Sequence, residues 1–333
     1  MTLAAAVTTA CRKEAAPESD NQQVQKTSLT VKLTDSMETK ATGIKGDASD
    51  EEKVNSLQVF IFNGETIDGY GKAADATSVN IGCTVGSRDI YALVNAPDLS
   101  SVGSRSALLG QISELGNSLS NMEMIGSKTE DIKAGMAPVT IGVDRFAARV
   151  VVRKVTNALT SPALQKQEFI LQSMHLNNVA GDIDYGLSGN YTVGTWYNKM
   201  ALQTGSGGPG TMIHDAIGSR ISSGSSYDTD HFFYAYPNSA AFSSSTDWSP
   251  RATMLVLKIQ IGSTLYNYPI RLPGLESNMS YEIDEIEITR PGNKDDGKVG
   301  GADEQEPVQG MDGSFSISIR KWTTKTVTEG TII

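Results

Sequence analysis

Runs in which apolar and polar residues alternate recur along the whole chain, and they constrain its fold more than any other feature. Near the beginning, Leu29, Val31 and Leu33 alternate with polar residues, and near the end the same pattern spans Phe315 to Ile319. A period of two lets one face of a β-strand pack against a core while the other meets water. Because helix-period segments are few and glycine is abundant, the sequence predicts an all-β chain with many turns.

The last stretch, GSFSISIRKWTTKTVTEGTII, combines two extended runs with an apolar end. Phe315 to Ile319 reads as a strand, Lys325 to Thr328 also favours an extended chain, and the sequence finishes with Ile332 and Ile333. Most domains end in a frayed polar tail, so an apolar end needs a surface to cover it. We predict that Phe315 to Ile319 is the last strand of its own sandwich. The residues after Trp322 either pair inside their own domain or lie in a groove on a neighbouring molecule.

A length of 333 residues suggests about two domains. The strand pattern breaks at Asn157 to Pro162, where a proline and a polar run follow a strand, and it resumes beyond that point. We therefore expect a signal remnant and tether over residues 1–26, an N-terminal β-sandwich domain over 27–157 and a C-terminal one over 158–333.

One helix is expected within this framework, in the N-terminal domain. Leucines and an isoleucine lie at helical spacing between Ser104 and Leu119, with Ser104 as a plausible N-cap. The acidic, glycine-rich stretch Asn293 to Gln309 is expected to be a solvated loop. The strand-like runs are Ser28 to Thr34, Asn55 to Asn63, Ser78 to Val85, Arg88 to Asn95, Pro138 to Val143, Phe146 to Val155, Glu168 to Asn177, His231 to Tyr236, Ala252 to Ile261, Thr264 to Arg271 and Met279 to Ile288.

Composition argues against several classes of function. The net charge is −10, whereas nucleic acids and anionic membrane surfaces are bound by basic patches. No GxSxG motif and no phosphate-cradling glycine motif occurs. The histidines are not at zinc-ligand spacing to one another or to a cysteine; they are His175, His214 and His231. We therefore expect no enzyme, no cofactor, no metal site and no nucleic-acid partner.

The two cysteines have different surroundings. Cys83 lies in a strand-like run and is expected to be a small buried apolar residue. Cys11 follows small and apolar residues and precedes a polar stretch, as in the end of a bacterial lipoprotein signal peptide. The segment before Cys11 has no basic region and is shorter than the roughly 15–30 residues of a secretory signal. A start codon further upstream would explain both features, and we expect Cys11 to be lipidated.

Several segments, taken in their order along the chain, resemble the fimbrillins, the type V pilus subunits of Bacteroidetes. Cys11 and its tether begin the series. The other segments are SLQVFIFN, RDIYALVNAP followed by a helix and a methionine-rich strand, FAARVVVRKV, LPGLESNMSYEIDEIEITRPG, and FSISIRKW with its extension. The resemblance covers nearly the whole chain, and the order of the motifs carries it.

The resemblance implies two tandem transthyretin-like β-sandwich domains and a structural role in a cell-surface fimbria. Such stalk subunits are exported as outer-membrane lipoproteins, here through Cys11. A trypsin-like protease then removes the first strand, and the groove accepts the C-terminal strand of the next subunit. Carried over to this sequence, the displaced strand contains Leu29, Val31 and Leu33, and the donor strand contains Val327, Ile332 and Ile333. The implied partners are other copies of the chain, other pilus subunits, the lipid anchor, and a host or bacterial surface ligand.

One feature departs from the family pattern. The family's protease usually cuts after arginine, but no arginine lies between Arg12 and Arg88. The basic candidates in the polar loop after the first strand are Lys40, Lys45 and Lys53. Either the protease accepts lysine, or the chain is a surface lipoprotein that does not polymerise and serves as a pilus anchor or as an adhesin for glycans or host surfaces.

Overall fold

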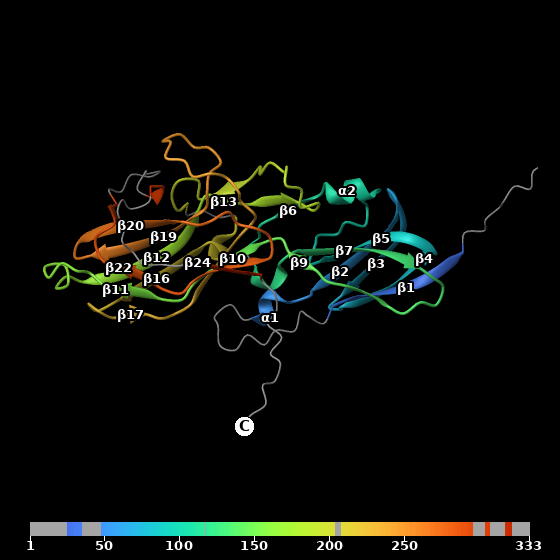
Figure 1. Cartoon of the computed structure of the whole chain (residues 1–333), viewed down its shortest axis with the longest axis horizontal. Helices are drawn as coiled ribbons and strands as arrows, with labels where there is room; N and C mark the ends of the chain where they lie inside the picture. The colour runs from blue at the N-terminus through green and yellow to red at the C-terminus, as the bar shows by residue number, and fades with distance from the viewer. Residues whose placement is uncertain are drawn as a thin grey trace, which may run out of the picture.

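The computed structural model describes residues 25–34, 48–116, 118–203, 208–295, 304–306 and 317–321. These residues form an elongated molecule built almost entirely from β-strands, with one group of sheets at each end (Figure 1). The expected all-β class is confirmed. The helical segments are short: α1 (Ala48–Glu51), α2 (Arg105–Leu109) and the 3-10 turns η2 (Leu119–Asn121) and η3 (Gly210–Met212). Among the described residues, no helix has the length and apolar character needed to cross a membrane.

Two sheets make up the N-terminal group. A five-stranded sheet has the order β3-β2-β5-β7-β9, and a three-stranded sheet has the order β4-β1-β8. Their strands are β1 (Lys26–Leu33), β2 (Ser56–Asn63), β3 (Thr66–Ala74), β4 (Ser78–Thr84), β5 (Gly86–Val94), β7 (Met124–Ile132), β8 (Val139–Ile141) and β9 (Asp144–Arg145).

Strand β2 shows why the five-stranded sheet is apolar on both faces. Leu57, Val59 and Ile61 belong to a core cluster shared with β1, while Phe60 and Phe62 belong to a larger cluster that extends into the C-terminal half of the chain. All five side chains are fully buried. A strand covered on both faces loses the simple alternation of an exposed sheet, which explains the nearly continuous apolar run in this part of the sequence.

Three further sheets make up the C-terminal group, with the orders β18-β10-β21-β24, β17-β11-β22 and β16-β12-β19-β20-β23. Their strands are β10 (Ala148–Val152), β11 (Val155–Asn157), β12 (Phe169–Asn177), β16 (His214–Arg220), β17 (Ser226–Tyr227), β18 (His231–Ala235), β19 (Met254–Ile261), β20 (Thr264–Arg271), β21 (Met279–Ile283), β22 (Ile286–Ile288), β23 (Asn293–Lys294) and β24 (Ile317–Lys321). Two small sheets remain, in which β13 (Val179–Ala180) pairs with β15 (Trp196–Tyr197) and β6 (Ile112–Glu114) pairs with β14 (Asp182–Asp184).

The chain passes from the N-terminal sheets to the C-terminal sheets earlier than the expected junction at Asn157 to Pro162. Strand β9, ending at Arg145, still pairs with β7, whereas β10 and β11 pair with β18, β21, β17 and β22. The apolar face of β10 packs among residues of the C-terminal group, and its Val150, Val151 and Val152 are fully buried. Local sequence could not reveal this partnership because β10 and β21 lie far apart along the chain.

The expected helix over Ser104 to Leu119 is wrong beyond its first turns. Ser104 does cap α2, since its Oγ accepts a hydrogen bond from the Ala107 backbone N–H at 3.1 Å. The helix ends before Gly110, and Ile112 already lies in β6, whose backbone pairs with β14. Ile112 is 44% exposed, so the helical spacing of apolar residues did not produce a buried stripe. Pairing with a distant strand overrode the local pattern.

Candidate functional site: the first strand and its groove

Strand β1 occupies the middle of its three-stranded sheet. It pairs antiparallel with β4, with Leu29 opposite Ile81, and parallel with β8, with Val31 opposite Val139. Hydrogen bonds also fix both ends of the strand. The Gln25 carbonyl accepts a hydrogen bond from the Val85 N–H at 3.0 Å, and the Thr34 N–H donates one to the Ile141 carbonyl at 3.0 Å. The strand therefore completes the backbone hydrogen bonding of two neighbours that are distant in sequence.

The inward face of β1 fills a core. Leu29, Val31 and Leu33 are 1%, 0% and 4% exposed, as their alternation in the sequence predicted. They pack in one cluster with apolar residues from β2, β4, β5, β7 and β8: Leu57, Val59, Ile61, Ile81, Cys83, Ile90, Ala92, Val94, Met124, Ile132, Val139 and Ile141. Without β1, this sheet would contain a groove with an apolar floor and unpaired backbone groups along both walls. Such a groove is a template for an incoming strand.

Cys83 lies on β4, opposite Thr27 of β1. It is a free thiol, only 4% exposed, as the sequence predicted for a small apolar residue. Burial raises the pKa of the Cys83 thiol, and the nearby carboxylate of Asp68 acts in the same direction. A protonated, covered thiol reacts slowly.

The other residues predicted to act in assembly are only partly visible. Cys11, Lys40, Lys45, Val327, Ile332 and Ile333 lie outside the described residues. Lys53 is described, is exposed, and follows α1. Of the expected last strand, Ile317 to Ile319 belong to β24, which pairs antiparallel with β21 in its own C-terminal sheet. That part of the prediction is confirmed, and Phe315 lies outside the described range.

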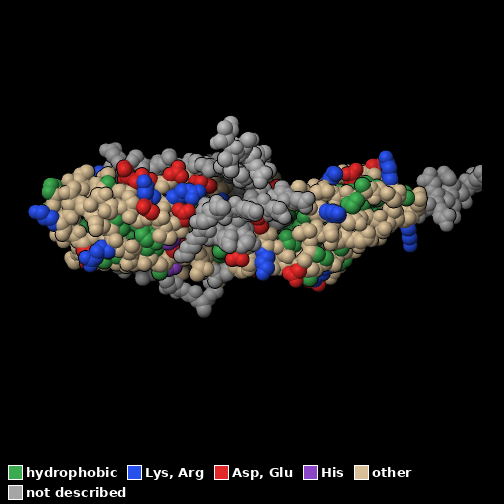
Figure 2. Space-filling view, turned by 90° about the horizontal axis from the view of Figure 1, so that it is seen from below, with side chains coloured by type: hydrophobic (Ala, Val, Ile, Leu, Met, Phe, Trp, Pro, Cys, Tyr) green, Lys and Arg blue, Asp and Glu red, His purple; other side chains and the backbone are tan. Residues whose placement is uncertain are grey.

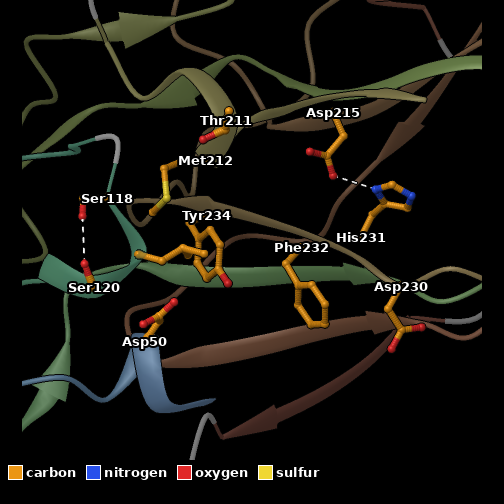
Figure 3. Close-up of a pocket in the computed structure, with 11 residues that line it drawn as sticks. Asp50, Ser118, Ser120, Thr211, Met212, Asp215, Asp230, His231, Phe232 and Tyr234 are labelled. Carbon is orange, nitrogen blue, oxygen red and sulfur yellow. Dashed lines mark hydrogen bonds and ion pairs between the residues drawn. The ribbon is translucent and has the colours of Figure 1, made fainter. Parts of the chain in front are cut away.

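A cavity of about 400 Å³ opens between η2 and α1 on one side and η3, β16 and β18 on the other (Figure 3). The Asp215 carboxylate lies 2.6 Å from His231 Nδ1, and Tyr227 OH lies 3.0 Å from Nε2 of the same ring. Because both ring nitrogens are engaged, His231 is held as a structural residue. Ser118 and Ser120 lie on the far side of the cavity from His231 (Figure 3), so this cavity does not assemble a Ser–His–Asp triad.

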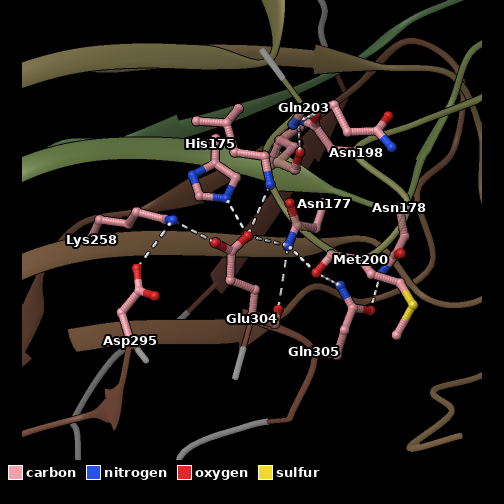
Figure 4. A network of polar contacts seen from close by, with 12 residues as sticks. His175, Asn177, Asn178, Asn198, Met200, Gln203, Lys258, Asp295, Glu304 and Gln305 are labelled. Atoms are coloured by element: carbon pink, nitrogen blue, oxygen red, sulfur yellow. Dashed lines mark hydrogen bonds and ion pairs between the residues drawn. The ribbon is translucent and has the colours of Figure 1, made fainter. Parts of the chain in front are cut away.

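A second polar cluster fixes a short segment that precedes β24 (Figure 4). The Glu304 carboxylate is contacted by Lys258 Nζ at 2.6 Å and by His175 Nε2 at 3.1 Å. It also accepts hydrogen bonds from the Leu202 N–H at 3.0 Å and from Asn177 Nδ2 at 3.1 Å. These partners come from β12, β19 and the loop after β15, so Glu304 ties three separate parts of the C-terminal group together.

The expectation of a solvated acidic loop is wrong for this cluster. Glu304 is 4% exposed, and Asp295 forms an ion pair with Lys258 at 3.5 Å. The buried carboxylate persists because a lysine and several N–H donors compensate for lost water. The sequence did not reveal the role of Glu304 because two of its partners, His175 and Leu202, lie more than a hundred positions away in the chain. The signal in the sequence was His175, a titratable residue within a strand-like run.

We expect the Glu304 cluster to make stability depend on acidity. Burial raises the pKa of Glu304, but the hydrogen bond and charge of His175, together with Lys258, outweigh it and lower the pKa from 4.5 to about 2. A lowered folded-state pKa adds stability above the unfolded value, and this stability is lost as pH falls from about 4.5 to about 2. Glu304→Gln should therefore lower the free energy of unfolding by about 2–3 kcal/mol at pH 7.

Denaturant unfolding at several pH values tests this expectation. The difference between wild type and Glu304→Gln should shrink as the pH falls toward 2. Glu306→Gln, which changes an exposed carboxylate in the same described segment, is the control and should follow wild type. Parallel curves for wild type and Glu304→Gln at all pH values would contradict the assignment.

The face shown in Figure 2 carries charged side chains of both signs. On the coloured parts of the face in Figure 2, lysines and arginines are scattered among acidic side chains and do not gather into one basic patch. The full sequence carries a net charge of −10.

Residues 27–140 match the family model described as major fimbrial subunit protein (FimA). This range contains β1 from Thr27 onward and most of both N-terminal sheets, while Ile141 of β8 and all of β9 lie beyond it. No curated protein sequence matches the chain. The match gives this part of the chain a sequence resemblance to major fimbrial subunits.

Solved structures of fimbrial proteins have the same fold over most of this chain. Fimbrilin FimA from Porphyromonas gingivalis aligns with a TM-score of 0.60 and 15% identity, covering 90% of this chain and 98% of that one. A candidate cell adhesion protein from Bacteroides eggerthii gives 0.64 and 18%, covering 91% and 98%. The C-terminally truncated tip fimbrial protein Mfa3 from Porphyromonas gingivalis gives 0.50 and 13%, covering 90% and 100%. The resemblance noted from the sequence is thereby confirmed.

Proposed function

We propose that this chain is a structural subunit of a cell-surface fimbria that polymerises by donor-strand exchange after proteolysis. The observation that carries the proposal is the placement of β1. It is the first described strand, it lies in the middle of a sheet, and its three inward side chains are buried in a closed core. The family match over residues 27–140 and the fold shared with FimA support the fimbrial role.

The proposed mechanism begins with export as a lipoprotein anchored through Cys11 in the outer membrane. A protease cuts between β1 and α1, and β1 leaves with its short N-terminal piece. The exposed walls of β4 and β8 then accept the C-terminal strand of another copy or of another pilus subunit. Val327, Ile332 and Ile333 supply the apolar side chains that replace those of β1. The role is structural and requires no catalytic residue or cofactor.

We further propose that the two groups of sheets are two tandem transthyretin-like β-sandwich domains. The change of strand partners between Arg145 and Ala148 supports an earlier boundary than 157. In this arrangement the N-terminal domain provides the groove and the C-terminal domain carries the donor extension beyond β24. One subunit thus presents a receiving end and a donating end.

The N-terminus of the assembled subunit tests this proposal. We expect intact-mass and N-terminal sequencing of fimbriae from the native host to show subunits that begin after Lys40 or Lys45. Those lysines lie between β1 and α1, so cutting there releases β1 and leaves the rest of the chain whole. The double variant Lys40→Gln, Lys45→Gln should stay unprocessed and should not form ladders on gels.

A different N-terminus would favour the second candidate function. The absence of arginine between Arg12 and Arg88 removes the usual recognition residue of an arginine-specific protease. Surface subunits that begin at a lipidated Cys11 and retain β1 would identify a non-polymerising lipoprotein, either a pilus anchor or an adhesin for glycans or host surfaces. A mature protein without lipid and without loss of β1 would contradict both candidates.

A further inference from the structure

The segment that follows the proposed cleavage region is fastened to both groups of sheets. In Figure 3, α1, which carries Asp50, lies close to Tyr234 of β18. We propose that Glu51 of α1 is the positioning residue that sets the downstream limit of processing, so that the bond after Lys53 stays protected. The inference rests on the proposed function, because it specifies where the removable part of the chain ends.

Glu51 is 2% exposed and spans two elements of the C-terminal group. Its carboxylate accepts a hydrogen bond from Tyr234 OH at 2.5 Å and forms an ion pair with Arg149 Nη1 of β10 at 2.9 Å. Its backbone carbonyl accepts from Arg145 Nε at 3.1 Å. Burial, followed by the charge of Glu51, raises the pKa of Tyr234, so the phenol remains protonated and able to donate.

The chain just after Glu51 is held from the other side. The Lys53 carbonyl accepts a hydrogen bond from Asn95 Nδ2 at 2.7 Å, and the Asn55 N–H donates a hydrogen bond to Asn95 Oδ1 at 2.8 Å. Val54 packs against the core cluster that contains β1. The bond between Lys53 and Val54 therefore lies inside a hydrogen-bonded segment, even though the Lys53 side chain is exposed.

A protease must bind several extended residues around the bond it cuts. Cutting after Lys53 would require residues 53–55 to detach from Asn95. It would also require Glu51 to detach from Tyr234 and Arg149. The rate of such cleavage follows the population of the locally opened state. Removing Glu51 would take the carboxylate away from the half-buried Arg149 and the buried Tyr234. This loss would raise the population of the locally opened state. Exposure of the lysine alone thus does not make Lys53 a processing site.

Limited trypsin digestion of the full-length chain under native conditions, followed by intact-mass analysis, measures this protection. We expect wild type to keep the Lys53–Val54 bond while bonds upstream of α1 are cut. Glu51→Ala should increase cutting after Lys53 by about tenfold or more. Asp50→Ala, an exposed substitution in the same helix, is the matched control and should leave the rate unchanged.

Two further readouts separate this role from general destabilisation. Tyr234→Phe keeps the aromatic ring but removes the hydroxyl that contacts Glu51, so this distant change should also accelerate cutting after Lys53. Lys258 in β19 reports global opening, and its cleavage should not increase in either variant. Equal protection of Lys53 in all variants, or rapid cutting after Lys53 in wild type, would overturn the inference. Neither result would bear on whether processed subunits polymerise, which ladder formation measures separately.

Discussion

Removing Thr323 to Ile333 is expected to abolish polymers while leaving the monomer folded. The truncation lies beyond β24, whose antiparallel pairing with β21 ends at Lys321, so that sheet stays intact. In a groove, each backbone hydrogen bond of the donor contributes roughly 0.5–1.5 kcal/mol, and each buried aliphatic side chain adds roughly 1.5–3 kcal/mol. Ordering the segment costs about 1–2 kcal/mol per residue, so the net affinity depends on how well the apolar side chains fill the groove.

Point substitutions should show that dependence. Val327→Asp or Ile332→Asp should weaken assembly far more than Thr324→Ala, the control that removes a hydroxyl and methyl from the same segment. Gel ladders measure assembly, and thermal unfolding of the monomer measures its fold. A truncated chain that still polymerises, or a monomer that unfolds when only this segment is removed, would identify the segment as an ordinary core strand.

The thiol of Cys83 is expected to become reactive when β1 leaves. In a Cys11→Ser background, Cys83 is the sole thiol, since the chain has two cysteines. It is now covered beside β1, and burial raises its pKa. Loss of β1 should open that side of the core, restore thiolate formation, and increase the rate of reaction with a water-soluble disulfide reagent by roughly a hundredfold.

The same assay can examine refilling of the groove. A synthetic peptide with the sequence of residues 323–333 should slow the reaction of Cys83 again, whereas the peptide carrying aspartate at the position of Val327 should not. Thiol reactivity of the urea-unfolded chain gives the upper limit. A processed chain whose Cys83 stays unreactive without peptide would mean that β1 does not cover this groove or that another segment replaces it at once.

The elements that the sequence predicted are those whose pattern is local. Alternation identified β1 and its three buried residues. The strand-like runs Ala252 to Ile261 and Thr264 to Arg271 contain β19 and β20, which pair with each other across Gly262, where φ is 61°. The buried position of Cys83 was also predicted. In each case, a residue's environment followed from its immediate neighbours in the chain.

The features that the sequence did not reveal depend on distant partners. The apolar residues after Gly110 have helical spacing, but β14 captures Ile112 to Glu114 as a strand. The ion-pair partners of Arg149 and Arg153 could not be read from the sequence, because they come from three remote segments: Glu51, Asp230 and Glu282. The burial of Glu304 likewise requires His175 and Lys258 to be brought together by folding.

The covalent link between β1 and α1 also sets an effective concentration. While residues 35–47 join them, β1 competes for its groove at roughly millimolar local concentration, as expected for a short tether. A donor strand from another molecule must compete at its actual concentration, which is far lower in dilute solution. In the proposed exchange, cutting the link turns β1 into a dilute ligand, whereas donor strands would be displayed densely on neighbouring subunits. A single cleavage can therefore reverse the competition without changing any contact within the groove.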